Sequence, residues 1–133
     1  ESGYKRVLPG QFVIHLRSFQ GGFAHSEIEG ITSPAYTVMG FKMPDKQHDR
    51  FWKYLLTSKN FIKSLETVTY GIRDGRSIFF NDFGSLKQSF PCKEEQKHIA
   101  NILTITDSYI RRNSQKLIKI CIMKQSLLQK MFV

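Results

Sequence analysis

Cysteine is scarce in this sequence, and long apolar runs are missing. The two cysteines, Cys92 and Cys121, fit no CxxC or Cys/His spacing, so neither a zinc site nor a disulfide framework is predicted. No apolar run approaches the roughly 20 residues that cross a bilayer, and no signal peptide precedes the fold. These absences favour a cytoplasmic protein. The chain does not begin with methionine, which suggests a fragment or a processed chain.

Signatures of catalysis are missing as well. The sequence contains no G-x-S-x-G, no G-x-x-x-x-G-K-[ST] and no H-E-x-x-H, the short motifs of several common enzyme classes. The four histidines follow no ligand spacing, and we expect them to be structural or to lie at the surface: His15, His25, His48 and His98. We therefore predict a chain without catalytic residues and without a metal site or cofactor of its own.

Acidic residues are outnumbered by basic ones. The 133 residues include 20 Lys plus Arg against 11 Asp plus Glu, a net charge of +9. Divided at Ser89, the first part carries 12 basic and 8 acidic residues and the remainder carries 8 and 3. A basic chain of this size is a candidate for binding phosphates, although a solvated basic surface without a polyanion partner has the same composition.

The first part of the chain has the pattern of β-structure. Apolar and polar residues alternate over Phe12–Leu16, which predicts a half-buried strand entered through a turn at Pro9-Gly10. A second strand is predicted over Ala35–Lys42, where β-branched and aromatic residues gather between two prolines.

The middle of the chain changes to helical spacing. Two short helices are predicted between Asp45 and Val68, with a break and a new cap at Ser58–Asn60. A turn-rich stretch follows over residues 70–77. Beyond it we predict a short strand over Ile78–Phe80 and a single helical turn capped by Asn81 and Asp82.

The last part predicts one long helix. Pro91 suits a first turn, and no Gly or Pro follows before Val133. A seam of residues at alternating steps of four and three forms a heptad repeat about 60 Å long, and its polar members can fix register: Ile99, Leu103, Thr106, Ile110, Asn113, Leu117, Ile120, Lys124, Leu127 and Met131. So long an apolar stripe favours a partner helix over burial along its own domain. The predicted fold is α+β, with one domain over residues 1–89 and the helix over residues 90–133.

Four blocks of the sequence resemble the specificity subunit of a type I DNA restriction-modification enzyme. The blocks are PGQFVIHLRSFQGGFAHSEIEGITSPAY, FWKYLLTSKNFIKSL, GIRDGRSIFFNDFGSL and FPCKEEQKHIANILTITDSYI. Their order and spacing match the later half of a target-recognition domain and the helix behind it, over nearly all of Leu8 to Met131. The most specific part is P-x-x-x-E-Q-x-x-I-A at Pro91 to Ala100. Family members usually carry two recognition domains and two helices, whereas this chain has one helix and lacks the first half of the domain.

The resemblance implies a role and its partners. In that family a recognition domain reads one half of a bipartite duplex DNA target. Long helices pair as an antiparallel coiled coil that spaces two domains and docks the methyltransferase subunits, with a restriction and motor subunit in the complex. S-adenosylmethionine, ATP and Mg²⁺ belong to those partners. A half-sized subunit would form a homodimer through the helix, whose expected interface residues are Ile99, Leu103, Ile110, Asn113, Leu117, Ile120, Leu127 and Met131.

Within such a domain, two loops are candidate DNA contacts. Arg suits guanine edges and Gln suits adenine edges, while glycines let a backbone approach phosphates. The predicted contacts are Arg17, Ser18, Gln20, Gly21, Gly22, Arg73, Arg76, Ser77 and Lys87.

Each of these features also fits an ordinary structural role without DNA binding. Gly21-Gly22 fits a plain hairpin turn with a solvated Arg17, and Arg73 with Asp74 fits an ion-paired turn. For the whole chain, the alternatives are a coiled-coil scaffold remnant without DNA reading, or the recognition module of a fused nuclease-methyltransferase.

Overall fold

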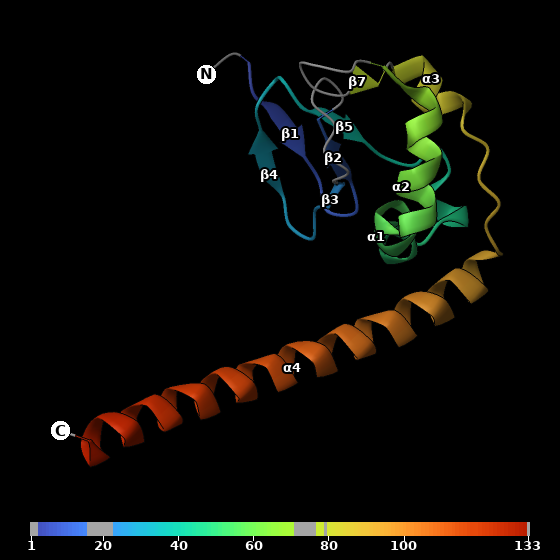
Figure 1. Cartoon of the computed structure of the whole chain (residues 1–133). Helices are drawn as coiled ribbons and strands as arrows, with labels where there is room; N and C mark the ends of the chain where they lie inside the picture. The colour runs from blue at the N-terminus through green and yellow to red at the C-terminus, as the bar shows by residue number, and fades with distance from the viewer. Residues whose placement is uncertain (1–2, 16–22, 71–76, 79, 133) are drawn as a thin grey trace. The chain divides into compact units, whose positions relative to one another are not determined.

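The computed structural model has an α+β fold that divides into two compact units, Glu1–His98 and Ile99–Val133. Residues 3–15, 23–70, 77–78 and 80–132 are described, with the backbone alone for residues 69, 70 and 77. The first unit holds small antiparallel sheets and short helices, and the second consists of one long helix (Figure 1).

All the described strands are short and pair antiparallel. Three small sheets form, in the orders β1-β4, β3-β2-β5 and β6-β7. Their strands are β1 Lys5–Val7, β2 Phe12–Ile14, β3 Ala24–His25, β4 Gly30–Thr32, β5 Thr37–Met39, β6 Thr69–Tyr70 and β7 Ser77–Ile78.

The two strands expected in the first part are present but shorter than predicted. In β2, Phe12 and Ile14 are buried and Val13 is half-buried, which confirms the period of two. Leu16, the last residue of the predicted strand, lies outside the described residues. The strand predicted over Ala35–Lys42 is confined to Thr37–Met39 in β5. Its length is set by β2, which offers only three residues for pairing.

A tight turn leads into β2 as expected. The backbone N–H of Gln11 donates to the carbonyl oxygen of Leu8 at 3.1 Å, and Gly10 has a φ of 83°. With Pro9 at the second position and a positive φ at the third, this is a type II turn. Glycine suits the third position because other residues are strained there.

The two predicted helices are confirmed as α1 (Asp49–Thr57) and α2 (Lys59–Leu65). Ser58 separates them, and its hydroxyl accepts from the backbone N–H of Phe61 at 3.3 Å, which caps α2. Single 3₁₀ turns precede and follow the pair at Pro44–Lys46 and Glu66–Val68.

The prediction for Ile78–Phe80 is wrong at its end. Within the described residues strand β7 covers Ser77–Ile78 and pairs with β6, and Phe79 lies outside them. Phe80 is already the first residue of α3 (Phe80–Ser85), so Asn81 and Asp82 lie inside the helix and do not cap it. Asp82 in the first turn is favourable beside the positive end of the helix dipole.

One hydrophobic core joins the β3-β2-β5 sheet to the helices. Its buried members come from β2, β7, α1, α2 and the residue before β3, and half-buried apolar side chains pack against them. The buried set is Phe12, Ile14, Phe23, Leu56, Phe61, Leu65 and Ile78.

The long helix α4 (Lys93–Met131) runs for 39 residues. It begins three residues after the predicted start at residue 90, and its first turn is closed by a hydrogen bond from the N–H of Gln96 to the carbonyl of Cys92 at 2.9 Å. Pro91 therefore precedes the helix and is not in its first turn. Glu94 and Glu95 do lie in the first turn, as expected. The residues Lys93–His98 of α4 belong to the first unit.

Candidate functional site

Most of the predicted DNA contacts fall outside the described residues: Arg17, Ser18, Gln20, Gly21, Gly22, Arg73 and Arg76. Two are within them. Ser77 is the first residue of β7, and its backbone pairs with Tyr70. Lys87 is exposed in the segment between α3 and α4.

The residues that border the two predicted loops are described, and they share one core. Phe23 directly follows Gly22, and Ile78 lies two positions after Arg76; both are buried in the same cluster as Ile14. The Phe23 ring packs against Phe61 with centroids 5.8 Å apart. The structure therefore places Phe23 and Ile78, the described residues next to these two segments, in one core.

Gln96 lies in the first turn of α4, in the part of the helix that belongs to the first unit. Its side chain is fully buried. The side-chain oxygen accepts from the backbone N–H of His48 at 2.9 Å, and the side-chain nitrogen donates to the carbonyl of Pro91 at 2.9 Å. Because a buried amide is costly unless its hydrogen bonds are made, this arrangement fixes the first turn of α4 against the residue that precedes α1.

The network around Gln96 extends to the single tryptophan. The nitrogen of Gln96 also lies 3.5 Å from the side-chain oxygen of Gln47, which accepts from the indole N–H of Trp52 at 2.7 Å. Trp52 in turn packs against Phe90, with ring centroids 5.1 Å apart. These contacts give the glutamine of the family-like motif, Gln96, a structural role that sequence reasoning missed. The only signal for it was a glutamine placed among charged residues at the start of a helix.

A second polar pair, of a buried histidine with a partly exposed aspartate, joins β3 to α1. Nε2 of His25 lies 2.7 Å from Oδ2 of Asp49, and the His25 side chain is only 2% exposed. Burial opposes the charge on Asp49, but the hydrogen bond and positive charge of His25, with further help from the Arg50 backbone and His48, outweigh burial and lower the pKa of Asp49. Sequence reasoning placed His25 without a partner, because 24 positions separate the two residues.

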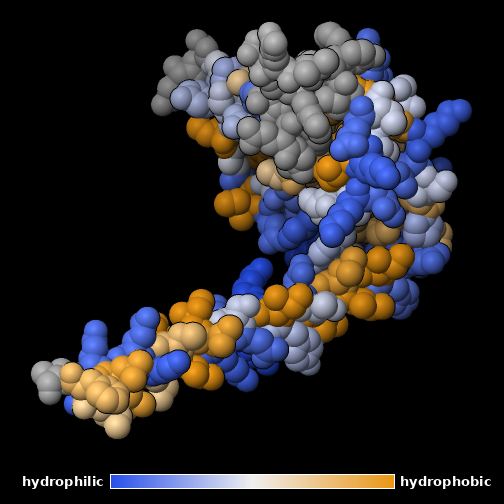
Figure 2. Space-filling model, viewed as in Figure 1, coloured by the Kyte–Doolittle hydropathy of each residue, from blue (hydrophilic) through white to orange (hydrophobic). Residues whose placement is uncertain are grey.

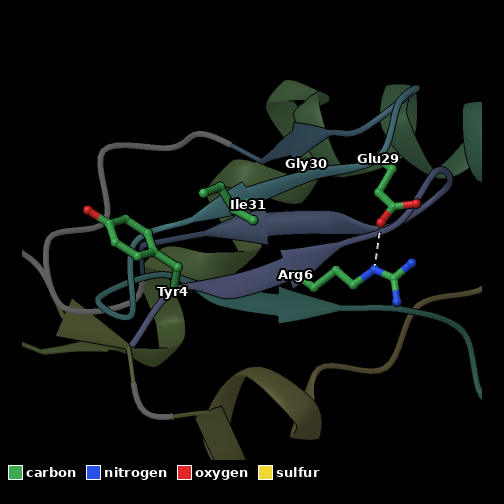
Figure 3. Close-up of a pocket in the computed structure, with 5 residues that line it drawn as sticks. All are labelled: Tyr4, Arg6, Glu29, Gly30 and Ile31. Carbon is green, nitrogen blue, oxygen red and sulfur yellow. Dashed lines mark hydrogen bonds and ion pairs between the residues drawn. The ribbon is translucent and has the colours of Figure 1, made fainter. Parts of the chain in front are cut away.

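A shallow surface pocket lies on the β1-β4 sheet (Figure 3). It is lined by Tyr4, Arg6, Glu29, Gly30 and Ile31. Arg6 Nε donates to Glu29 Oε1 at 2.7 Å, and both side chains are more than half exposed. Since its cation already has a carboxylate partner, this pocket is a poor phosphate site.

Apolar side chains run along the whole length of α4 (Figure 2). The seam residues beyond Thr106 are all exposed. Large apolar members remain more than half exposed, at 59% for Ile110, 62% for Leu117 and Ile120, 57% for Leu127 and 72% for Met131. A stripe of this kind indicates an interaction surface.

The positive charge is concentrated on the helix. The first unit carries 14 basic and 10 acidic residues, and residues 99–133 carry 6 basic and 1 acidic. The net charge of the helical unit, +5, therefore exceeds the +4 of a first unit that is nearly three times as long.

Neither a metal site nor a membrane span is found in the described part of the chain. Within residues 3–15, 23–70, 77–78 and 80–132, no three His, Cys, Asp or Glu side chains gather as metal ligands. No helix there combines the length and hydropathy that crossing a bilayer requires. The two cysteines are free and exposed.

Neither the models of known protein families nor the curated proteins give a match to this chain.

Proposed function

We propose that this chain is a DNA sequence-specificity module of a type I restriction-modification system. Residues 1–89 would read one half of a bipartite duplex target. Helix α4 (Lys93–Met131) would recruit the methyltransferase and restriction subunits, which use S-adenosylmethionine, ATP and Mg²⁺. The chain itself supplies no catalytic group in this proposal.

The observation that carries the proposal is that residues next to the two candidate loops in the sequence share one buried core. Phe23 and Ile78, which border the arginine-bearing segments, belong to one buried cluster with Ile14. Reading a base sequence requires donors that a rigid scaffold holds near each other. The four-block resemblance and the net positive charge support the same role.

Five aromatic side chains of the first unit are packed against other residues and are not free to stack on the bases of single-stranded DNA. Phe12, Phe23, Phe51 and Phe61 are buried, and Trp52 is engaged with Gln47 and Phe90. A single-strand binder stacks bases on exposed aromatic rings, whereas these five rings are engaged in the interior of the unit.

A coiled-coil scaffold without DNA reading is the second candidate. The charge distribution favours it, since residues 99–133 have 6 basic residues against 1 acidic while the first unit is nearly balanced at 14 against 10. In this alternative the helix binds the partner proteins, and the globular unit has only a structural role.

Capture of partners followed by DNA selection tests the proposal. The tagged chain is incubated with nuclease-treated lysate of its own host, and the retained complex is offered a library of random duplexes. We expect retention of an adenine methyltransferase subunit and enrichment of one half-site. The variant Leu117→Asp with Ile120→Asp should lose the methyltransferase, because two charges in the seam oppose helix pairing.

Substitutions in the loops separate the two candidates. Combined alanine at Arg17, Gln20, Arg73 and Arg76 should abolish the sequence preference, at about 1–3 kcal/mol for each lost bidentate contact, while the methyltransferase stays bound. Lys59→Ala with Lys63→Ala on α2, both exposed, is the control and should leave the preference unchanged. Methyltransferase retention without any half-site enrichment would support the scaffold instead.

A further inference from the structure

Helix α4 carries charge of one sign beyond Asp107. Six basic residues and no acidic residue follow in residues 108–133. All six are exposed: Arg111, Arg112, Lys116, Lys119, Lys124 and Lys130. The chain therefore offers no carboxylate of its own, within this part of the helix, to offset that charge.

Three of these lysines lie where a paired helix would approach. Lys124 occupies a seam position between Ile120 and Leu127. Lys116 directly precedes the seam residue Leu117, and Lys130 directly precedes Met131. The last two share one flank of the seam, the position from which a coiled-coil helix forms ion pairs with its partner.

Pairing with a second copy of this chain places like charges together. In a parallel pair in register, Lys124 would face Lys124 of the other copy across the seam. An antiparallel pair centred between Ile118 and Lys119 would place Lys124 opposite Asn113 and relieve that contact. Both arrangements still align two stretches that carry six positive charges each, and such self-repulsion opposes association.

We infer that residues 109–131 of α4 pair with an acidic amphipathic helix that differs from α4 in sequence. The partner presents apolar residues to the seam and carboxylates opposite Lys116, Lys124 and Lys130. Its seam contacts supply the affinity, and its charge excludes a second copy of α4. The inference rests on the helix-pairing part of the proposed function and is independent of DNA reading.

Two defined peptides test this inference with the full chain. Each has four heptads, about 28 residues, with isoleucine and leucine at the seam. One carries glutamate at the flanking positions, and the other carries lysine there. We expect the glutamate peptide to bind at least about tenfold more tightly in fluorescence anisotropy at about 50 mM salt. The advantage should shrink at about 500 mM salt, where surface charges are screened.

Charge reversal on the chain supplies the matched controls. Lys116→Glu, Lys124→Glu and Lys130→Glu together should reverse the peptide preference. Substitution of Arg111, Arg112 and Lys119 by glutamate should alter the peptide preference less, because these residues lie off the seam and its flanks. Circular dichroism checks that each variant stays helical.

Two results would overturn the inference. One is equal binding of both peptides by the unsubstituted chain. The other is a stable homodimer in sedimentation at the peptide-binding concentrations, with neither peptide able to dissociate it. Because no DNA is present, failure here leaves the proposal for DNA reading to be judged by its own assay.

Discussion

Gln96 shows how one residue connects two parts of the fold. Its buried amide accepts from the His48 N–H and donates to the Pro91 carbonyl, both at 2.9 Å. Removing the amide would leave the His48 N–H without this partner in a buried setting, which costs more than the hydrogen bond itself contributes.

We expect Gln96→Ala to lower the free energy of unfolding by about 1–3 kcal/mol. Urea denaturation followed by Trp52 fluorescence measures it, since Trp52 is the single tryptophan and belongs to the same network. Gln88→Ala is the control, because Gln88 is exposed and its side-chain hydrogen bond to the Ser89 carbonyl is long, at 3.4 Å. Equal stability of the two variants would mean that the Gln96 contacts contribute nothing measurable.

The contact between Asp49 and His25 predicts that the free energy of unfolding depends on pH in the acidic range. Because the folded state lowers the pKa of Asp49, the carboxylate stabilises the fold at pH values above its unfolded pKa. That contribution is lost as the pH falls from about 4, the ordinary aspartate value, through the lower folded value.

Asp49→Asn tests this pH dependence. Its unfolding free energy should lie below that of the unsubstituted chain near neutral pH, and the difference should shrink as the pH falls below about 4. The effect is modest, because the Asp49 side chain is 37% exposed and solvent screens the pair. Asp82→Asn provides a comparison in the first turn of α3. A difference that stays constant from neutral to acid pH would contradict the assignment to Asp49.

At the scale of elements, the pair α1 and α2 depends on a single residue between them. Ser58 ends α1 and caps α2 through its hydroxyl. Phe61 and Leu65, two residues of the core, lie on the helix that it caps. The cap thus orients side chains on which the shared core depends.

Ser58→Ala should cost about 0.5–2 kcal/mol of unfolding free energy, the usual loss for a helix N-cap. Ser64→Ala on the same helix is the matched control. Its hydroxyl donates to the Phe61 carbonyl inside the helix, and alanine is the better helix former, so its effect should stay within about 0.5 kcal/mol. Thermal unfolding followed by circular dichroism and Trp52 fluorescence would compare them, and a larger loss for Ser64→Ala would contradict the role of the cap.

At the scale of the whole molecule, the hydrophobic core lies in the first unit, whereas most of the long helix exposes its apolar side chains. The first unit buries Ile14, Phe23, Leu65 and Ile78 in one core. The helix beyond Thr104 has no buried or half-buried residue in its described part. In water, so much exposed apolar surface favours association with another helix.

Local patterns predicted the helices better than the strands. The positions of α1 and α2 and the length of α4 follow from apolar spacing and from the missing Gly and Pro after Pro91. The strands β1, β3, β4 and β6 were not predicted, because two or three residues are too few to show a period. The predicted DNA-contact loops lie mainly outside the described residues, so those contacts stay predictions.

The sequence by itself determined what depends on neighbouring residues: the type II turn at Gly10, the break at Ser58, the unbroken helix α4 and its one-sided charge. Tertiary structure alone decided what depends on distant residues. β5 pairs with β2, and β7 pairs with β6. Asp49 meets His25 across 24 positions, and Gln96 meets His48 across 48. No local periodicity encodes such pairs, because they form only when the core brings separate elements together.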